Sequence, residues 1–223
     1  MGFWSGLGSL VSSACSFVGS CVSSVGRALV GAATTVIEKL GSVIDTVVNV
    51  VKSVGVALGI IKPEDNIEEL GARACESDLK PENFDSVTEY IEHLKNDIEL
   101  DKEKFESRSK DVRLAHKGIG LAIMKDGIKE KSGIEITDDF LLHVGKNNIS
   151  GSETLGIINS FKLNGETSTE KFDTYMKNTM TLEEKIKIGG IIVDGFVAGN
   201  KDVDRDKMEN RLTEIELSTN GLK

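Results

Sequence analysis

The residue types that most often carry catalysis are present but scattered along the chain. The three histidines stand far apart, at His93, His116 and His143. A few acidic residues near the first of them could share one helical face, but a solvated amphipathic helix explains that stretch better. The chain lacks a GxSxG nucleophile elbow, an HExxH zinc motif and a GxxxxGK[ST] phosphate loop. The sequence therefore predicts a protein that is not an enzyme.

Acidic residues alternate near the C-terminus in a pattern that resembles the start of a calcium loop. Asp202, Asp204 and Asp206 occupy the first, third and fifth positions. An EF-hand needs Gly at the sixth position and Glu at the twelfth, where this chain has Lys207 and Thr213. The residues instead suit the first turn of a final helix near 203–217, because carboxylates favour the positive end of the helix dipole. We predict no metal site and no cofactor.

The cysteines are three in number, which gives neither a disulfide framework nor a zinc pattern. Cys15 and Cys21 lie in an apolar segment and Cys75 lies further along. Free cysteines pack as small hydrophobic residues. The sequence therefore indicates synthesis in the reducing cytoplasm.

Charge divides the chain into two unequal parts. Residues 1–62 carry a net charge of +2, whereas residues 63–223 carry 23 basic and 34 acidic residues, a net charge of −11. Nucleic-acid binding requires clustered Lys and Arg, so no nucleic-acid partner is predicted. An acidic body does not favour electrostatic docking on anionic lipid either.

The N-terminal segment does not resemble a cleavable signal peptide or a flexible linker. The first basic residue is Arg27, and no uninterrupted apolar run before it exceeds three residues. Apolar residues recur at helical spacing, which a Gly/Ser linker lacks. We therefore expect a helix over 8–36 and export, if any, without a classical leader.

One face of this predicted helix carries only small residues. They follow one another four residues apart: Gly8, Ser12, Ser16, Ser20, Ser24, Ala28 and Ala32. We call these seven residues the small-residue row. Small residues at this spacing allow helices to approach to backbone distance, as in membrane-helix dimers. The row is a candidate pore-lining or helix-packing surface. The alternative is an ordinary helix in the core of a protein, with its small residues against a neighbouring helix.

A second apolar segment at 40–61 follows a possible turn at Gly41 and Ser42. Its Leu, Ile and Val residues favour membrane insertion by about 5 kcal/mol, while Asp45 and Lys52 oppose it by about 6 kcal/mol. Both N-terminal segments are expected to be long enough to cross a bilayer at about 20 residues per span. Because the favourable and unfavourable insertion energies nearly cancel, we expect insertion that is conditional on delivery and partners.

The fold class predicted is all-α, with three parts. Residues 1–62 form the N-terminal apolar helical segment with conditional membrane insertion, 63–82 a hinge with one short helix at 64–75, and 83–223 an acidic domain of about seven helices. The stretch 186–197 is expected to be a buried core helix rather than a span. Four capping boxes predict helix starts: Ser86 with Glu89, Ser150 with Glu153, Thr167 with Glu170, and Thr181 with Glu184.

This plan, a Gly/Ser/Val-rich conditional span before an acidic helical body without catalytic motifs, resembles the small ion-selective pore-forming effectors of bacterial type VI secretion systems, of the Serratia kind. The resemblance covers overall plan and length. It implies cytoplasmic synthesis, delivery by a contractile injection machine, and insertion into the inner membrane of a neighbouring bacterium. Depolarisation by a cation leak and a membrane-located immunity protein in the producer would follow.

The expected function is accordingly an antibacterial toxin that forms a cation-selective pore, with membrane lipid, copies of itself and a secretion-machine component or chaperone as partners. Glu38 and Asp45 flank the turn, where oligomerisation would gather them into acidic rings that favour cations. The alternative is a non-toxic membrane-associated or scaffold component, of a phage or a secretion apparatus, whose N-terminal helices pack with a partner. A hydrolase without a recognisable motif is a third alternative.

Overall fold

The computed structural model describes residues 3–200, 203–219 and 221, with side chains from residue 8 onward. These residues form twelve α-helices and one short 3-10 helix, and their only extended pairing is an isolated bridge between Glu135 and Ser168. The all-α fold class is therefore confirmed for the described residues. Asp202, part of the alternating acidic pattern, lies outside them.

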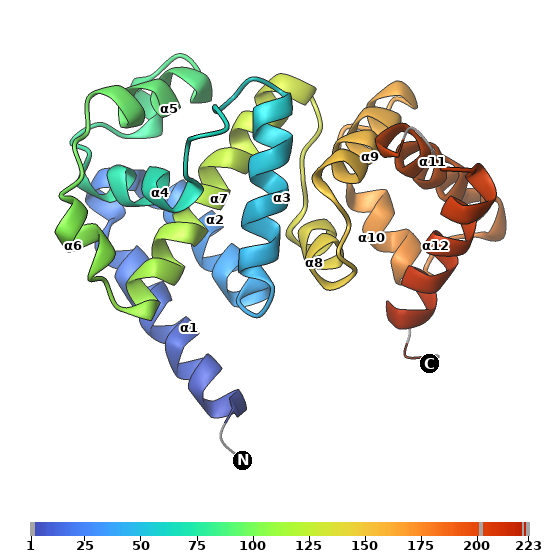
Figure 1. Ribbon diagram of the computed structural model, residues 1–223, viewed down its shortest axis with the longest axis horizontal. Helices are drawn as coiled ribbons and strands as arrows, with labels where there is room; N and C mark the ends of the chain where they lie inside the picture. Colours follow the sequence, from blue (N-terminus) through green and yellow to red (C-terminus); the bar gives the residue numbers. More distant parts are fainter. Residues whose placement is uncertain (1–2, 201–202, 220, 222–223) are drawn as a thin grey trace.

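The helices follow one another with short connections (Figure 1). Their bounds are α1 Phe3–Ser20, α2 Val22–Leu40, α3 Ile44–Ala57, α4 Ile67–Glu76, η1 Pro81–Asn83, α5 Val87–Asn96, α6 Lys102–Glu106, α7 Lys110–Ser132, α8 Asp138–Lys146, α9 Gly151–Leu163, α10 Glu170–Met176, α11 Leu182–Gly199 and α12 Arg205–Thr219.

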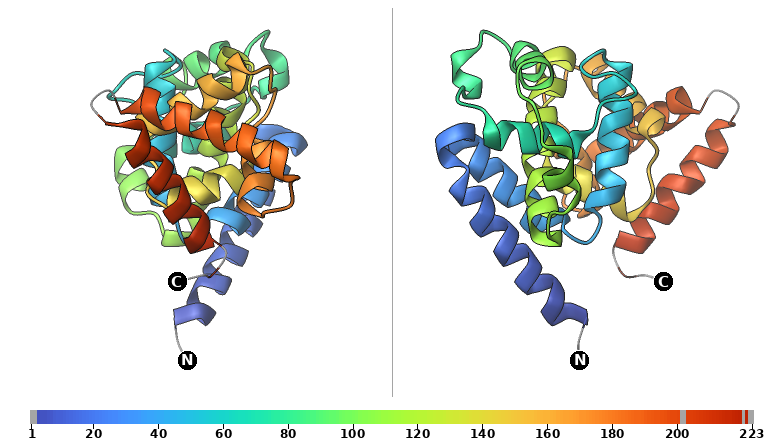
Figure 2. Two further views of the ribbon diagram at one scale, coloured as in Figure 1. Left: turned by 90° about the vertical axis from the view of Figure 1, so that its right-hand side faces the viewer. Right: turned by 60° about the vertical axis from the view of Figure 1, so that its left-hand side comes forward.

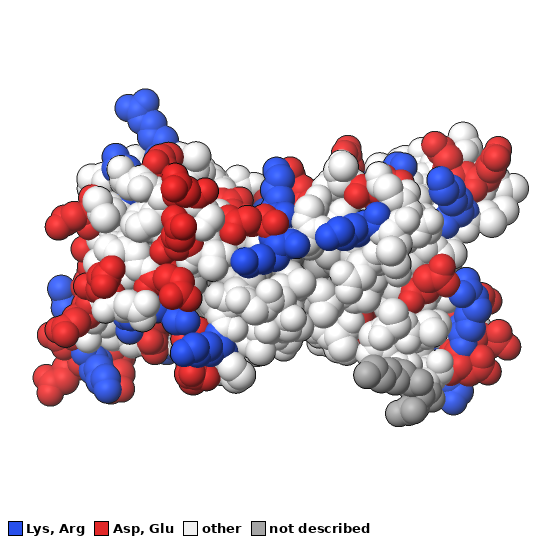
Figure 3. Space-filling view, turned by 90° about the horizontal axis from the view of Figure 1, so that it is seen from above, with Lys and Arg blue, Asp and Glu red and all other residues white. Residues whose placement is uncertain are grey.

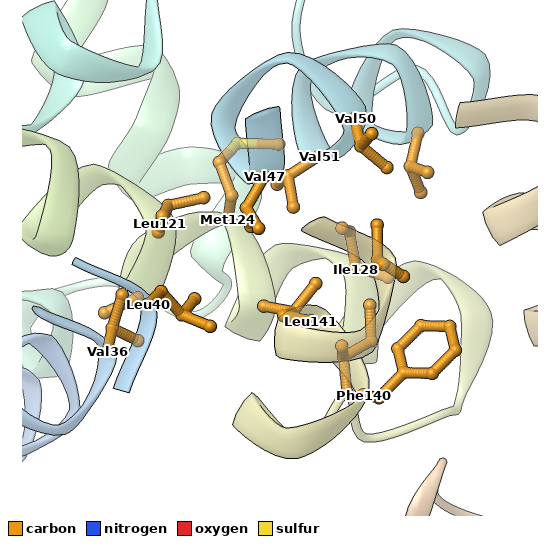
Figure 4. Close-up of a cluster of buried hydrophobic side chains, with 14 of the residues drawn as sticks. Val36, Leu40, Val47, Val50, Val51, Leu121, Met124, Ile128, Phe140 and Leu141 are labelled. Atoms are coloured by element: carbon orange, nitrogen blue, oxygen red, sulfur yellow. The ribbon is translucent and has the colours of Figure 1, made fainter. Parts of the chain in front are cut away.

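The long helix α7 lies at the centre of the N-terminal half. Apolar and small residues cover almost its whole circumference from Leu114 to Ile128, so it is stable only when other helices surround it. α1, α2, α3, α4 and α5 all pack on it. Figure 4 shows where α2, α3, α7 and α8 meet, with Leu40, Val47, Met124 and Leu141 pointing toward one another.

The second half of the chain packs α9 against α11, with α10 and α12 beside α11 (Figure 1). α3 contacts both α8 and α9, and the buried apolar residues of both halves form one continuous cluster. The expected core helix at 186–197 is confirmed within α11, where Ile192 and Phe196 are fully buried. The division of the chain at residue 62 stays a prediction.

Acidic side chains gather at one end of the molecule, the end formed by α5 and α6 in Figure 1, while a wide neutral surface lies between the two halves (Figure 3). Residues after position 82 form α5 to α12, eight α-helices among the described residues where about seven were expected. The difference includes the one-turn helix α6, which Asp101 caps by accepting a hydrogen bond from the Lys104 backbone at 3.1 Å.

The sequence signals for helix ends have mixed outcomes. The capping boxes at Ser150 and Thr181 are confirmed with both reciprocal hydrogen bonds. Ser86 caps α5, but the carboxylate of Glu89 accepts from the backbone of Asp85 instead. The box at Thr167 is wrong: α10 begins at Glu170, because residues 167–169 run beside 135–137, where the Thr167 carbonyl accepts from the Glu135 amide at 2.9 Å.

The predicted short helix of the hinge is confirmed as α4, which begins later than expected. Asn66 caps it by accepting from the Glu68 amide at 2.9 Å, so the helix starts at Ile67 rather than residue 64. The turn predicted at Gly41 and Ser42 is also confirmed, since α2 ends at Leu40.

Close helix crossings in this fold depend on glycine rather than on the small-residue row. A Cβ atom at Gly120 of α7 would collide with the Ile67 carbonyl of α4, and one at Gly195 of α11 would lie 2.6 Å from the Cα of Ile157 in α9. Both clashes involve backbone, which cannot move aside cheaply. Each pair of helices therefore requires glycine at its crossing point.

We expect Gly195→Ala to lower the free energy of unfolding by about 1–3 kcal/mol, because the new methyl group overpacks the crossing of α9 and α11. Gly190→Ala in the same helix is the matched control, since nothing lies within 4 Å of a Cβ there. The control should gain about 0.5–1 kcal/mol from helix propensity. Urea denaturation measures both, and equal effects would contradict the assigned crossing.

Candidate functional site

The small-residue row is divided between two helices. Gly8, Ser12, Ser16 and Ser20 lie on α1, and Ser24, Ala28 and Ala32 lie on α2. The prediction of one continuous helix over 8–36 is therefore wrong. The chain turns at Cys21, and Gly26 adopts φ 79° and ψ 159°, a backbone conformation that side-chain-bearing residues rarely adopt.

α1 and α2 form a helical hairpin whose two faces differ. The apolar face is buried against the body: Ala14, Val18, Val25, Leu29, Ala33 and Val36. The small-residue row faces outward and is exposed except at half-buried Ser24. The N-terminal end of α1 projects beyond the other helices (Figures 1 and 2). The row thus contacts solvent in this state.

Three hydroxyl groups of the hairpin donate hydrogen bonds within their own helices. Ser16 donates to the Ser12 carbonyl at 3.0 Å and Ser20 to the Phe17 carbonyl at 2.6 Å. Thr35 donates to the Gly31 carbonyl at 3.1 Å. These bonds need no water, so the hairpin loses less on transfer to an apolar environment than its serine content suggests.

No helix in the described part of the chain combines the length and hydropathy that a membrane span requires. α3 illustrates the shortfall: its 14 residues reach about 21 Å, against a hydrocarbon thickness of about 30 Å. The expectation that the segment 40–61 is long enough to cross a bilayer is therefore wrong for the helix formed here. The turn at Gly41 and the left-handed Gly59 shorten it.

The two candidate selectivity residues lie on either side of the turn between α2 and α3. Glu38 is exposed near the end of α2. Asp45 lies in the first turn of α3, 78% exposed, and accepts from Lys117 of α7 at 2.5 Å. The neighbouring Lys39 pairs with Asp139 of α8 at 2.6 Å. These ion pairs tie the open end of the hairpin to the body.

A cavity of about 390 Å³ lies at the other end of the hairpin, where the junction of α1 and α2 meets α4, α6 and α7. It is lined by two residues of the small-residue row, by two cysteines, and by aromatic and charged side chains. These are Ser20, Ser24, Cys21, Cys75, Phe17, Phe105, His116, Lys104 and Arg108. No sequence pattern predicted this assembly, because its residues come from four separate segments.

A buried carboxylate organises the charges beside this cavity. The side chain of Glu68 is 7% exposed and lies 3.0 Å from Arg113, 3.5 Å from Arg108 and 3.8 Å from Lys117. Arg108 also stacks over the Phe105 ring at 3.3 Å. Three cations around one buried carboxylate fix α4 to α7 and to the loop before it.

His116 connects this charged group to the hairpin. Its Nδ1 accepts a hydrogen bond from Arg108, and its ring meets Phe17 of α1 edge to face at 5.3 Å. Burial, together with the Arg108 charge, lowers the pKa of His116 to about 3. The ring is therefore neutral, and protonating it would remove the acceptor for Arg108 and place two cations together.

Comparison with known proteins adds no family to this picture: no family model, no curated protein and no solved structure matches the chain. The candidate site therefore consists of the exposed row, the acidic pair at the α2–α3 turn and the cavity under the α1–α2 junction.

We expect stability to fall as pH decreases from about 6.5 toward 3, because the unfolded chain then protonates His116 while the folded protein does not. At pH 5 this costs about 2 kcal/mol relative to pH 7.5. His116→Gln, which keeps an acceptor, should reduce the pH 7.5 to pH 5 difference in unfolding free energy by that amount. Other buried groups titrate in the parent and the variant alike and cancel in the comparison. If the variant shows the same pH 7.5 to pH 5 difference as the parent, His116 is not the group responsible.

Proposed function

We propose that this chain is a pore-forming antibacterial toxin whose α1–α2 hairpin leaves the body and inserts into the inner membrane of a target cell. The observation that carries the proposal is the two-faced hairpin. Its apolar face packs on α7, while the row of small residues lies unused on the outside. Once detached, the apolar face would need lipid, and the row would be free to contact another copy.

Because α1 and α2 each have low hydropathy, the proposal requires several hairpins to assemble in the membrane. α1 has 18 residues, about 27 Å of helix and close to the hydrocarbon thickness, whereas the break at Gly26 leaves α2 only residues 27–40 uninterrupted, about 21 Å. A single hairpin would leave its serines facing lipid. Packing several hairpins through the row would remove the serines from lipid.

The proposal implies the partners that a delivered toxin needs. A secretion-machine component or chaperone would cover the projecting α1 before delivery, and an injection machine would carry the protein out of the producing cytoplasm. A membrane-located immunity protein would protect the producer. In the target the partners are membrane lipid and further copies of the chain.

A second candidate function is a non-toxic scaffold component in which the hairpin stays folded and the row docks a partner helix. It is favoured by the finding that none of the described helices is long and apolar enough to span a membrane. Under this alternative, a chain expressed in bacteria with a periplasm-directing leader would leave the membrane potential unchanged.

We expect the parent chain, expressed with that leader, to depolarise cells, as measured with a potential-sensitive dye. Ser12→Leu with Ser16→Leu should still reach the membrane but lose depolarisation, because two large side chains prevent close helix approach. Thr35→Leu is the matched control, since it removes an exposed, back-bonded hydroxyl that lies off the row. Ser20 is avoided because it lines the cavity.

Each result decides a separate part of the proposal. Polarised cells with the parent protein in the membrane would reject pore formation and leave the scaffold function. A double variant as active as the parent would reject the row as the packing surface, while the pore would stand.

Channels in planar bilayers should be cation-selective, because assembly gathers Glu38 at the end of α2 and Asp45 in the first turn of α3 near the pore mouth, where acidic rings favour cations. Glu38→Gln with Asp45→Asn should shift the reversal potential toward zero. Glu99→Gln, an exposed acid in the body, should not. Detachment frees Lys39, so an anion-selective parent channel would show that the lysine prevails.

A further inference from the structure

Two cysteines from distant parts of the chain meet at the α1–α2 junction. Cys21 forms the turn between α1 and α2, and Cys75 lies in the last turn of α4. Both line the cavity, and their thiols hydrogen-bond to each other. Cys15 lies one and a half turns earlier on α1 and does not line this cavity.

The two thiols have unequal chemistry. The hydrogen bond from Cys75 lowers the pKa of Cys21, whereas the same bond and burial raise the pKa of Cys75. Burial raises the pKa of Cys15 as well. A thiolate is the attacking form in disulfide exchange, so Cys21 is the expected nucleophile and Cys75 the expected second thiol.

We propose that Cys21 and Cys75 form a reversible disulfide that fastens the α1–α2 junction to α4. α4 remains with the body because its backbone crosses α7 at Gly71 and Gly120, where no side chain fits. The bond would therefore hold the hairpin against the body. The disulfide itself is independent of the proposed function; only its effect on membrane insertion rests on that function.

The oxidant required is a small disulfide of the glutathione type, and the exchange balances with it. The Cys21 thiolate attacks one sulfur of glutathione disulfide, which breaks that S–S bond and releases one glutathione. Cys75 then attacks Cys21 in the mixed disulfide, and its proton passes to the second departing glutathione. The protein loses two electrons and two protons, and glutathione disulfide becomes two glutathione thiols.

The cavity gives this reaction its access. Cys21 and Cys75 both line this cavity of about 390 Å³; Cys21 is otherwise buried and Cys75 is half-buried. Because the two thiols lie within hydrogen-bonding reach, a disulfide would need side-chain rotation to reach its specific geometry. In reducing cytoplasm the pair would stay reduced, whereas in an oxidising compartment such as the periplasm the bond would form and oppose insertion. The depolarisation test described above therefore uses a thiol reductant or Cys75→Ser.

The full-length protein, equilibrated in mixtures of reduced and oxidised glutathione and then alkylated, tests the assignment by peptide mass mapping. We expect a disulfide between Cys21 and Cys75, with Cys15 alkylated. Cys75→Ser should trap a glutathione adduct on Cys21, which identifies the attacking thiol. A disulfide or adduct that involves Cys15 instead, or no disulfide in glutathione disulfide alone, would overturn the proposal.

Trypsin cleavage at Arg27 measures whether the disulfide holds the hairpin against the body. Arg27 is the first trypsin site in the chain and lies exposed on α2 beside the break at Gly26. Oxidation should slow cleavage there about tenfold or more, because cleavage requires local opening of the hairpin. Cleavage at Arg205 in α12 is the internal control. Equal rates at Arg27 in both redox states would reject the fastening.

Leakage from lipid vesicles separates this inference from the proposed function. Release of a trapped dye by the reduced protein, abolished by oxidation and restored by a thiol reductant, would support both. If the disulfide forms and slows trypsin but neither redox state causes leakage, the proposed function fails and the disulfide stands. Equal leakage from a fully disulfide-bonded and a reduced sample would overturn the fastening and leave pore formation intact.

Discussion

The fold depends on enclosing α7, a helix that has apolar or small residues on nearly every side. α4 reaches it at backbone distance because Gly71 and Gly120 carry no side chain, and a Cβ at either position would collide with the facing backbone. The remaining circumference needs α1, α2 and α3, which together cover residues that water would otherwise meet. The N-terminal segment is therefore required by the core of the protein as well as being the candidate for membrane insertion.

This double role explains the composition of the hairpin. Its inward face is apolar, as a core helix requires, and the outward small-residue row consists of Ser, Gly and Ala, with the Ser16 and Ser20 hydroxyls bonded within α1. Such a face is compatible with water and with a second helix, but it gives no strong preference for lipid. A strongly apolar outward face would drive aggregation in water. Under the proposed function, the low hydropathy would keep the protein folded in water before insertion.

Local patterns in the sequence predicted the helices well and their arrangement poorly. Hydrophobic spacing identified which face of the hairpin is buried. Ser150 and Thr181 correctly predicted the starts of α9 and α11, because capping is a contact between residues close in sequence. The break at Cys21 was missed because Cys, Val and Ser continue the helical spacing through it. Gly195 and Gly120 were not recognised as crossing points, since only the tertiary structure shows which backbone lies opposite them. The cavity was missed for the same reason, because Cys21, Cys75 and His116 come together only through tertiary packing.

The hairpin contacts the body along its length through its buried apolar face, and at its two ends it makes further contacts that differ in strength. At the α2–α3 turn the ties are Lys39 with Asp139 and Asp45 with Lys117, partly exposed pairs that each contribute about 1 kcal/mol or less and weaken in salt. At the α1–α2 junction the half-buried Phe17 meets the buried His116, and the buried Cys21 contacts the half-buried Cys75. These contacts are less exposed than those at the turn, so the turn should open first and the junction last. If the hairpin is released as proposed, an agent that acts on the junction, whether a proton on His116 or an oxidant at the thiols, would act on the last contact to open, and the apolar face of the hairpin would stay covered by α7 until then.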